Sequence, residues 1–198
     1  AVAVKAMRSP SSAEERARFL REASALKKLD HPCIARHVES GIDERYGPFL
    51  VTEWVEGEDM DGYLKEGPFD LLTGVEVARK LASALSHVHG RGLLHRDIKP
   101  GNVRFHAETR EVRLIDIGLA RAFGAGSDTM VTEPGQFLGT PRYVSPEQAR
   151  GEPALDPRSD VFSLGGVLYR GFSGRPAFDA PNLRALLYAV TAEPHVPL

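Results

Sequence analysis

The chain has 198 residues, of which 42% are hydrophobic and 26% charged, which is the composition of an ordinary folded globular protein. Its 25 lysine and arginine residues nearly balance 27 aspartate and glutamate residues, so charge indicates neither a nucleic-acid partner nor contact with a membrane surface. The single cysteine, Cys33, excludes an internal disulfide, and no apolar run reaches the roughly 18 residues of a membrane helix, so we expect a cytoplasmic protein whose parent carries any membrane anchor elsewhere.

The chain begins with a strand pattern followed by a helix pattern. Small and β-branched residues at 1–5 favour a short strand, and hydroxyl residues followed by acidic ones at 10–15 are typical of a helix start. Residues 30–32, DHP, end this helix, because a residue that precedes proline avoids the helical region. One face of the helix carries apolar residues at helical spacing, namely Phe19, Ala23, Leu26 and Leu29.

Two further strands are predicted at 34–40 and 49–55, on either side of a polar turn. With the first strand they indicate a small, strand-rich N-terminal lobe over residues 1–55, and residues 56–198 form a larger, mainly helical lobe. The larger lobe is predicted to contain helices at 71–90, 159–172 and 182–192, a hairpin at 103–105 and 112–115, and an exposed loop at 124–139. The sequence therefore predicts an α+β fold with two lobes.

Residues 95–102, HRDIKPGN, place a carboxylate, an ammonium group and a side-chain amide in one loop between a helix and the hairpin. Phosphoryl transfer to a hydroxyl requires a carboxylate near the acceptor proton, positive charge near the phosphates, and oxygen ligands for magnesium. Asp97, Lys99 and Asn102 supply these groups at a spacing that is highly specific for this chemistry. A second carboxylate, Asp116, follows a hydrophobic strand, where it can face a bound cation.

These two loops resemble the catalytic loop and the metal-binding loop of eukaryotic-type serine/threonine protein kinases, in a form similar to the bacterial members. The resemblance implies a bilobal kinase-like fold in which Asp97 accepts the proton of the substrate hydroxyl and Lys99 steadies the transferring phosphate. It also implies that Asn102 and Asp116 hold Mg²⁺. Residues 139–147 resemble the segment that closes the activation loop, and together with Lys99 they point to serine or threonine as the acceptor.

The N-terminal lobe carries the rest of the resemblance. Residues 2–5, VAVK, resemble the strand whose lysine holds the α- and β-phosphates of ATP, so Ala3 and Lys5 are expected at the nucleotide. Glu22 on the next helix would pair with Lys5, although an exposed helix charge is the alternative. The other expected nucleotide contacts are the gatekeeper Thr52, the backbone of Glu53 and Val55, Asp59 at the ribose, and Arg104 beneath the adenine.

The sequence departs from the family pattern in three places. The glycine-rich loop before Val2 and the last helices of the large lobe are absent, so we expect a chain truncated at both ends, for which an inactive fragment is one outcome. Glu147 then lacks the arginine that normally pairs with it, which would make its burial costly. Ile117 replaces a phenylalanine in the metal loop, and Arg104 replaces an apolar residue, so ATP affinity is expected to be lower than usual.

The favoured function is an active kinase that uses ATP and Mg²⁺ to phosphorylate serine or threonine in proteins. A pseudokinase scaffold is the second hypothesis, but the residues required for catalysis argue against it, since Lys5, Asp97, Asn102 and Asp116 are all present. A small-molecule phosphotransferase is the third, and such enzymes generally lack a segment like 139–147.

Activation by autophosphorylation is a further expectation. Arg96 beside Asp97 implies a positive pocket that a phosphate on the activation loop could fill. The resemblance also suggests dimerisation as a route to this reaction. The hydroxyls within reach are Ser127, Thr129 and Thr132.

Overall fold

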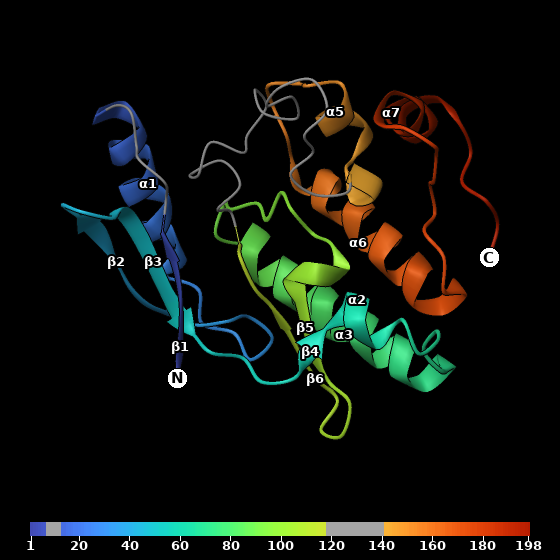
Figure 1. Cartoon of the computed structure of the whole chain (residues 1–198), viewed down its shortest axis with the longest axis horizontal. Coiled ribbons are helices and arrows are strands. Elements are labelled where there is room, and N and C mark those ends of the chain that lie inside the picture. The colour runs from blue at the N-terminus through green and yellow to red at the C-terminus, as the bar shows by residue number, and fades with distance from the viewer. Residues whose placement is uncertain (7–12, 118–140) are drawn as a thin grey trace.

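The computed structural model describes residues 1–6, 13–117 and 141–198 (Figure 1). Strands β1 (Val2–Ala6), β2 (His37–Asp43) and β3 (Gly47–Glu53) form an antiparallel sheet in the order β1-β3-β2. Helix α1 (Ala13–Leu26) lies beside this sheet at one side of the molecule, and the helical part lies at the other. The division into lobes over 1–55 and 56–198 stays a prediction.

Helix α1 is held by the apolar stripe that its spacing predicted. Phe19 is fully buried, and Ala23, Leu26 and Leu29 are nearly so, in the same core as Leu50 of β3. The burial of a phenylalanine or leucine side chain stabilises the folded state by about 1.5–3 kcal/mol. These apolar contacts therefore hold α1 against the sheet.

The strand predicted at 34–40 is wrong at its start, because the observed strand β2 begins at His37. Residues 33–35 instead pair with Leu114 at the end of β6 (Glu111–Leu114). The amide of Ala35 donates to the carbonyl of Leu114 at 2.9 Å, and the amide of Leu114 donates to the carbonyl of Cys33 at 2.8 Å. Backbone hydrogen bonds thus tie the segment before β2 to the larger part of the molecule.

Two long helices form the centre of the larger part. Helix α3 (Leu71–His89) and helix α6 (Pro157–Ser173) pack against each other, and α7 (Leu183–Ala192) lies near α5 (Pro146–Ala149). The helices predicted at 71–90, 159–172 and 182–192 are confirmed, with ends shifted by a residue or two. Helix α6 begins at Pro157, before the predicted start at residue 159, because the Asp156 side chain caps it and proline is a favourable first residue of a helix.

A small sheet brings the loops of the site together. Its order is β4-β5-β6, where β4 is Glu58–Asp59 and β5 is Val103–His106, and the predicted hairpin is confirmed as β5 and β6. The short helices α2 (Met60–Tyr63) and η1 (Pro100–Asn102) pack against it, whereas η2 (Pro141–Tyr143) packs against α6 and α7. Among the described residues, no helix has both the length and the apolar character needed to cross a membrane.

Candidate active site

Two polar side chains of the predicted catalytic loop, Lys99 and Asn102, meet at the carboxylate of Asp97. The Lys99 Nζ lies 2.7 Å from Asp97 Oδ2, and the Asn102 amide nitrogen donates to the same oxygen at 2.8 Å and to the Asp97 carbonyl at 2.7 Å. Ile98, buried between them, points into the core and anchors the loop. Because both amide hydrogens of Asn102 are used, its side-chain oxygen is the group that can face a cation.

The second predicted carboxylate lies next to this loop. The amide of Ile115 donates to the Asn102 carbonyl at 3.0 Å, which brings the residue that follows, Asp116, beside the catalytic loop. Asp116 Oδ2 lies 3.1 Å from the Nζ of Lys5 on β1. The structure therefore brings together Lys5, Asn102 and Asp116 from three separate parts of the chain.

The sheet presents the other expected nucleotide residues on one face. In the antiparallel pairing of β1 with β3, Ala3 lies opposite Thr52, and Lys5 lies opposite Leu50. Residues opposite each other, and those two positions apart, point to the same side of a sheet. A small cavity between this face and the metal loop is lined by Thr52, Leu50 and Asp116, among others.

The hinge residues have structural partners of their own. The Glu53 carboxylate accepts hydrogen bonds on Oε1 from Arg113 Nη1 at 2.6 Å and from the Arg36 amide at 3.0 Å, and the Glu53 amide donates to the Arg36 carbonyl at 2.9 Å. Val55 follows the end of β3. Asp59 also caps α2, because one of its oxygens accepts from the Gly62 amide at 2.8 Å.

Arg104 lies opposite Asp59 in the pairing of β4 with β5. Its guanidinium donates to the Gly57 carbonyl, so the charged head is held by the backbone after the hinge. The side chain of Glu22, the residues 7–12, and Ser127, Thr129 and Thr132 lie outside the described part of the structure.

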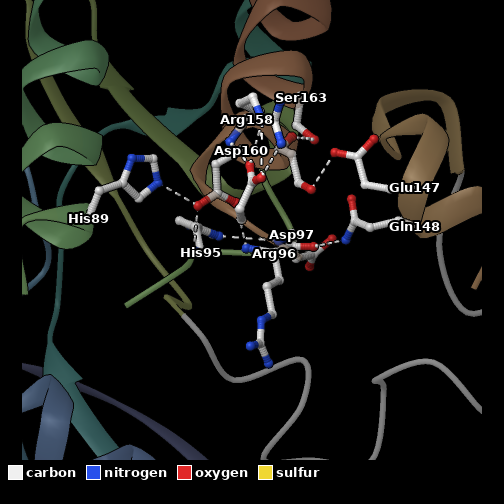
Figure 2. A network of polar contacts seen from close by, with 11 residues as sticks. His89, His95, Arg96, Asp97, Glu147, Gln148, Arg158, Asp160 and Ser163 are labelled. Atoms are coloured by element: carbon white, nitrogen blue, oxygen red, sulfur yellow. Dashed lines mark hydrogen bonds and ion pairs between the residues drawn. The ribbon is translucent and has the colours of Figure 1, made fainter. Parts of the chain in front are cut away.

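Asp160 of α6 binds the backbone of the catalytic loop with both of its carboxylate oxygens (Figure 2). Its two oxygens accept from the amides of His95 and Arg96, each at 2.8 Å, and Oδ2 also lies 2.8 Å from His89 Nε2. Complete burial lowers the pKa of His95, although the nearby charges of Asp160 and Asp97 oppose the shift. These contacts give Asp160 and His89 structural roles behind the catalytic loop, and sequence reasoning missed His89.

Glu147 is not left unpaired, contrary to expectation. Its carboxylate accepts a hydrogen bond from the hydroxyl of Ser159, which lies one turn from the start of α6. Partial burial acts to raise the pKa of Glu147, but this hydrogen bond and others outweigh it and hold the pKa below its usual range. The Ser159 hydroxyl is therefore a partner of the Glu147 carboxylate in this chain.

Gln148 is a second residue that sequence reasoning missed. Its side-chain nitrogen donates to the Arg96 carbonyl at 2.9 Å, which joins α5 to the catalytic loop. The only signal in the sequence was the Ser-x-x-Gln spacing from Ser145, which is typical of a capping box and predicts a helix start but no contact with a distant loop.

Comparison with known proteins places these features in context. A family model described as protein kinase domain matches residues 1–194. The chain is 39% identical over 183 residues to serine/threonine-protein kinase pkn2 of Myxococcus xanthus, covering 91% of this chain and 22% of pkn2. It is 38% identical over 202 residues to serine/threonine-protein kinase PknB of Mycobacterium tuberculosis, covering 99% of this chain and 32% of PknB.

A solved structure agrees with these sequence matches. The crystal structure of Rad53 1-466 in complex with AMP-PNP matches with a TM-score of 0.72 and 27% identity, over 96% of this chain and 45% of that chain. The chain spans about a fifth to a third of the length of the curated relatives it matches.

Proposed function

Because the chain belongs to the protein kinase domain family, we propose that it transfers the γ-phosphoryl group of ATP to serine and threonine hydroxyls of proteins. Family membership confirms the resemblance identified in the sequence, and the likeness to Rad53 confirms the kinase-like α+β fold. The observation that carries the proposal is the convergence of Lys99 and Asn102 on one oxygen of Asp97, beside the pair formed by Lys5 and Asp116.

The proposed reaction uses the remaining oxygen of Asp97. Since Oδ2 is engaged by Lys99 and Asn102, Oδ1 is the acceptor for the hydrogen bond and then the proton of the substrate hydroxyl. The hydroxyl oxygen forms a bond to the γ-phosphorus as the bond to the β–γ bridging oxygen breaks. Lys99 stabilises the negative charge that develops between these two oxygens.

Mg²⁺ fits the oxygen ligands that the site provides. An amide oxygen from Asn102 and a carboxylate from Asp116 are hard donors, and a magnesium site commonly takes one or two such protein ligands, with water and phosphate completing the octahedron. When bound, Mg²⁺ would neutralise phosphate charge. Lys5, 3.1 Å from Asp116, is suited to hold the α- and β-phosphates beside this metal.

We assign adenine to the hinge in the same proposal. The backbone of Glu53 and Val55 would bind the base, with Ala3 and Thr52 on the sheet face above it and Arg104 below. Asp59 keeps one oxygen for the ribose. Glu22 as the partner of Lys5, autophosphorylation, dimerisation and a cytoplasmic location stay predictions.

Radiolabel transfer from [γ-³²P]ATP to a protein substrate tests the function. The full-length protein should label serine and threonine, and Asp97→Asn should reduce kcat by at least about 10²-fold, since general base catalysis commonly contributes 10²–10⁴-fold. Omission of Mg²⁺ should also abolish transfer. Equal incorporation by wild type and Asp97→Asn would contradict the mechanism, and labelling of a small molecule alone would favour the phosphotransferase hypothesis.

A further inference from the structure

We propose that Gln148 is a positioning residue for catalysis, which holds the backbone of Arg96 and thereby fixes Asp97. The role rests on the proposed function, because it concerns the carboxylate that would accept the substrate proton. Figure 2 shows Gln148 reaching from α5 toward Arg96 and Asp97, on the side opposite His89. The contact runs from the Gln148 side-chain nitrogen to the Arg96 carbonyl at 2.9 Å.

The backbone at Arg96 needs such support. Its φ angle is 67°, in the left-handed region that residues other than glycine rarely adopt. Such a conformation persists only where surrounding contacts determine it. The Arg96 amide is held by Asp160 at 2.8 Å, and its carbonyl is held by Gln148, so the two polar groups of one strained residue are fixed from two different helices.

The peptide between Arg96 and Asp97 depends on Gln148 in particular. The carbonyl of this peptide is bound by Gln148 at 2.9 Å, whereas its amide hydrogen points to His95 Nδ1 across 3.4 Å, which is a long hydrogen bond. Loss of the Gln148 donor would remove the shorter of these two contacts and would make rotation of this peptide easier. Such a rotation would shift Asp97 relative to Lys99 and Asn102.

Gln148 is itself held rigidly. Its side-chain oxygen accepts from the backbone amide of Ser145 at 3.1 Å, and its backbone amide donates to the Ser145 hydroxyl at 3.3 Å. The two bonds form a capping box at the start of α5. Ser145 is completely buried. One amide side chain therefore uses its oxygen to cap a helix and its nitrogen to hold the catalytic loop, and these two roles can be separated by mutation.

Gln148→Glu separates them, because a carboxylate still accepts from the Ser145 amide but cannot donate to the Arg96 carbonyl. In the full-length protein we expect kcat to fall about 10- to 100-fold, the scale of a misplaced catalytic group, with the KM for ATP unchanged within about twofold. Gln148→Met removes the donor without adding charge and should lower kcat similarly. Ser145→Ala is the matched control, because it weakens the cap but leaves the contact with Arg96. It should lower the melting temperature and keep kcat within about twofold of wild type.

Amide hydrogen exchange provides a measurement that needs no turnover. Peptides covering residues 95–97 should exchange faster in Gln148→Glu and Gln148→Met than in wild type, and at the wild-type rate in Ser145→Ala. Unchanged kcat and unchanged exchange at 95–97, with only a lower melting temperature, would make Gln148 an ordinary capping residue and overturn the role. Absence of transfer by wild type would defeat the proposed function instead, and exchange at 95–97 would still decide whether Gln148 fixes the loop.

Discussion

Residues with unusual backbone angles lie beside the candidate site. Three residues other than glycine have a positive φ in the described ranges, and two of them belong to the site: Arg96, at 67°, precedes the proposed catalytic Asp97, and Asp116, at 60°, is the carboxylate proposed to bind the metal. Each such conformation costs about 1–3 kcal/mol and must be imposed by its surroundings. At Arg96, Asp160 and Gln148 impose it. The two loops therefore store strain where side chains must be aimed accurately.

Arg104 provides a test of nucleotide binding at the scale of one residue. Arg104→Leu would place apolar surface beneath the proposed adenine position, and we expect the Kd for ATP to fall about 4-fold, as the burial of one additional methylene would allow. The substitution also removes the donor to the Gly57 carbonyl, so stability should fall by about 0.5–1.5 kcal/mol. Isothermal titration calorimetry measures the first effect and urea unfolding the second. A higher Kd would place Arg104 among the groups that attract the nucleotide.

Ser159 provides a second test, of the pairing of Glu147. Ser159→Ala removes the hydroxyl that donates to the Glu147 carboxylate, and a partly buried charged acceptor that loses a donor costs about 1–3 kcal/mol. Unfolding in urea at pH 7 should show this loss. The difference should shrink below about pH 4.5, the ordinary pKa of a glutamate, since the hydrogen bond that lowers the pKa of Glu147 stabilises only its ionised form. A loss that is independent of pH would indicate a packing effect at Ser159.

Whole elements differ in how well the sequence predicts them. Helix α3 was predictable because its apolar period runs over 19 residues between an aspartate cap, Asp70, and a glycine end, Gly90. Strand β4 and helices α2 and α5 were not, because elements of two to four residues show no period. The same limit explains the candidate site: the spacing within 95–102 predicted a cluster, whereas the contacts of Gln148 and His89 join segments far apart in the chain and leave no local pattern.

The junction between α3 and the segment after α1 should be sensitive to pH. The rings of His31 and His87 lie 5.2 Å apart, His31 Nε2 is 3.0 Å from the Ser83 hydroxyl, and the Asp30 amide donates to His87 Nε2. Burial lowers the pKa of both histidines, the nearby charge of Arg91 lowers both further, and each is below the usual 6.5. Asp30 opposes the shift at His87 only in part.

Acidification should therefore destabilise this junction. Since the histidine pKa values are lower in the folded chain, the unfolded chain binds more protons below about pH 6.5, and stability should fall as pH drops from 7 to 5.5. Urea unfolding at several pH values measures the slope. His31→Gln combined with His87→Gln should make the slope shallower, while buried His95 keeps part of it in both proteins. An unchanged slope would assign the whole dependence to His95 and other groups.

In the molecule as a whole, hydrogen bonds join the part that contains the three-stranded sheet and α1 to the larger helical part, and the site lies where these two parts meet. Backbone hydrogen bonds link residues 33–35 to Leu114, and the Arg91 guanidinium donates to the Lys28 carbonyl at 3.0 Å. These contacts hold the sheet and α1 against the helical part. The pair of Lys5 and Asp116 crosses the same boundary, but its side chains are 46% and 37% exposed, and pairs that solvent screens in this way contribute little to stability.

Lys5→Met should consequently separate activity from stability. Loss of the charge proposed to hold the ATP phosphates should reduce kcat/KM by at least about 10²-fold, a loss of roughly 2.7 kcal/mol in transition-state binding. Unfolding free energy should change by less than about 1 kcal/mol, because the lost ion pair is half-exposed and the methionine keeps an apolar stem. Steady-state phosphoryl transfer and urea unfolding measure the two quantities, with Lys65→Met as an exposed control that should change neither. If Lys5→Met instead lowered stability by several kcal/mol, its partners, Asp116 among them, would be holding the two parts of the molecule together, and the loss of activity would no longer report on phosphate binding.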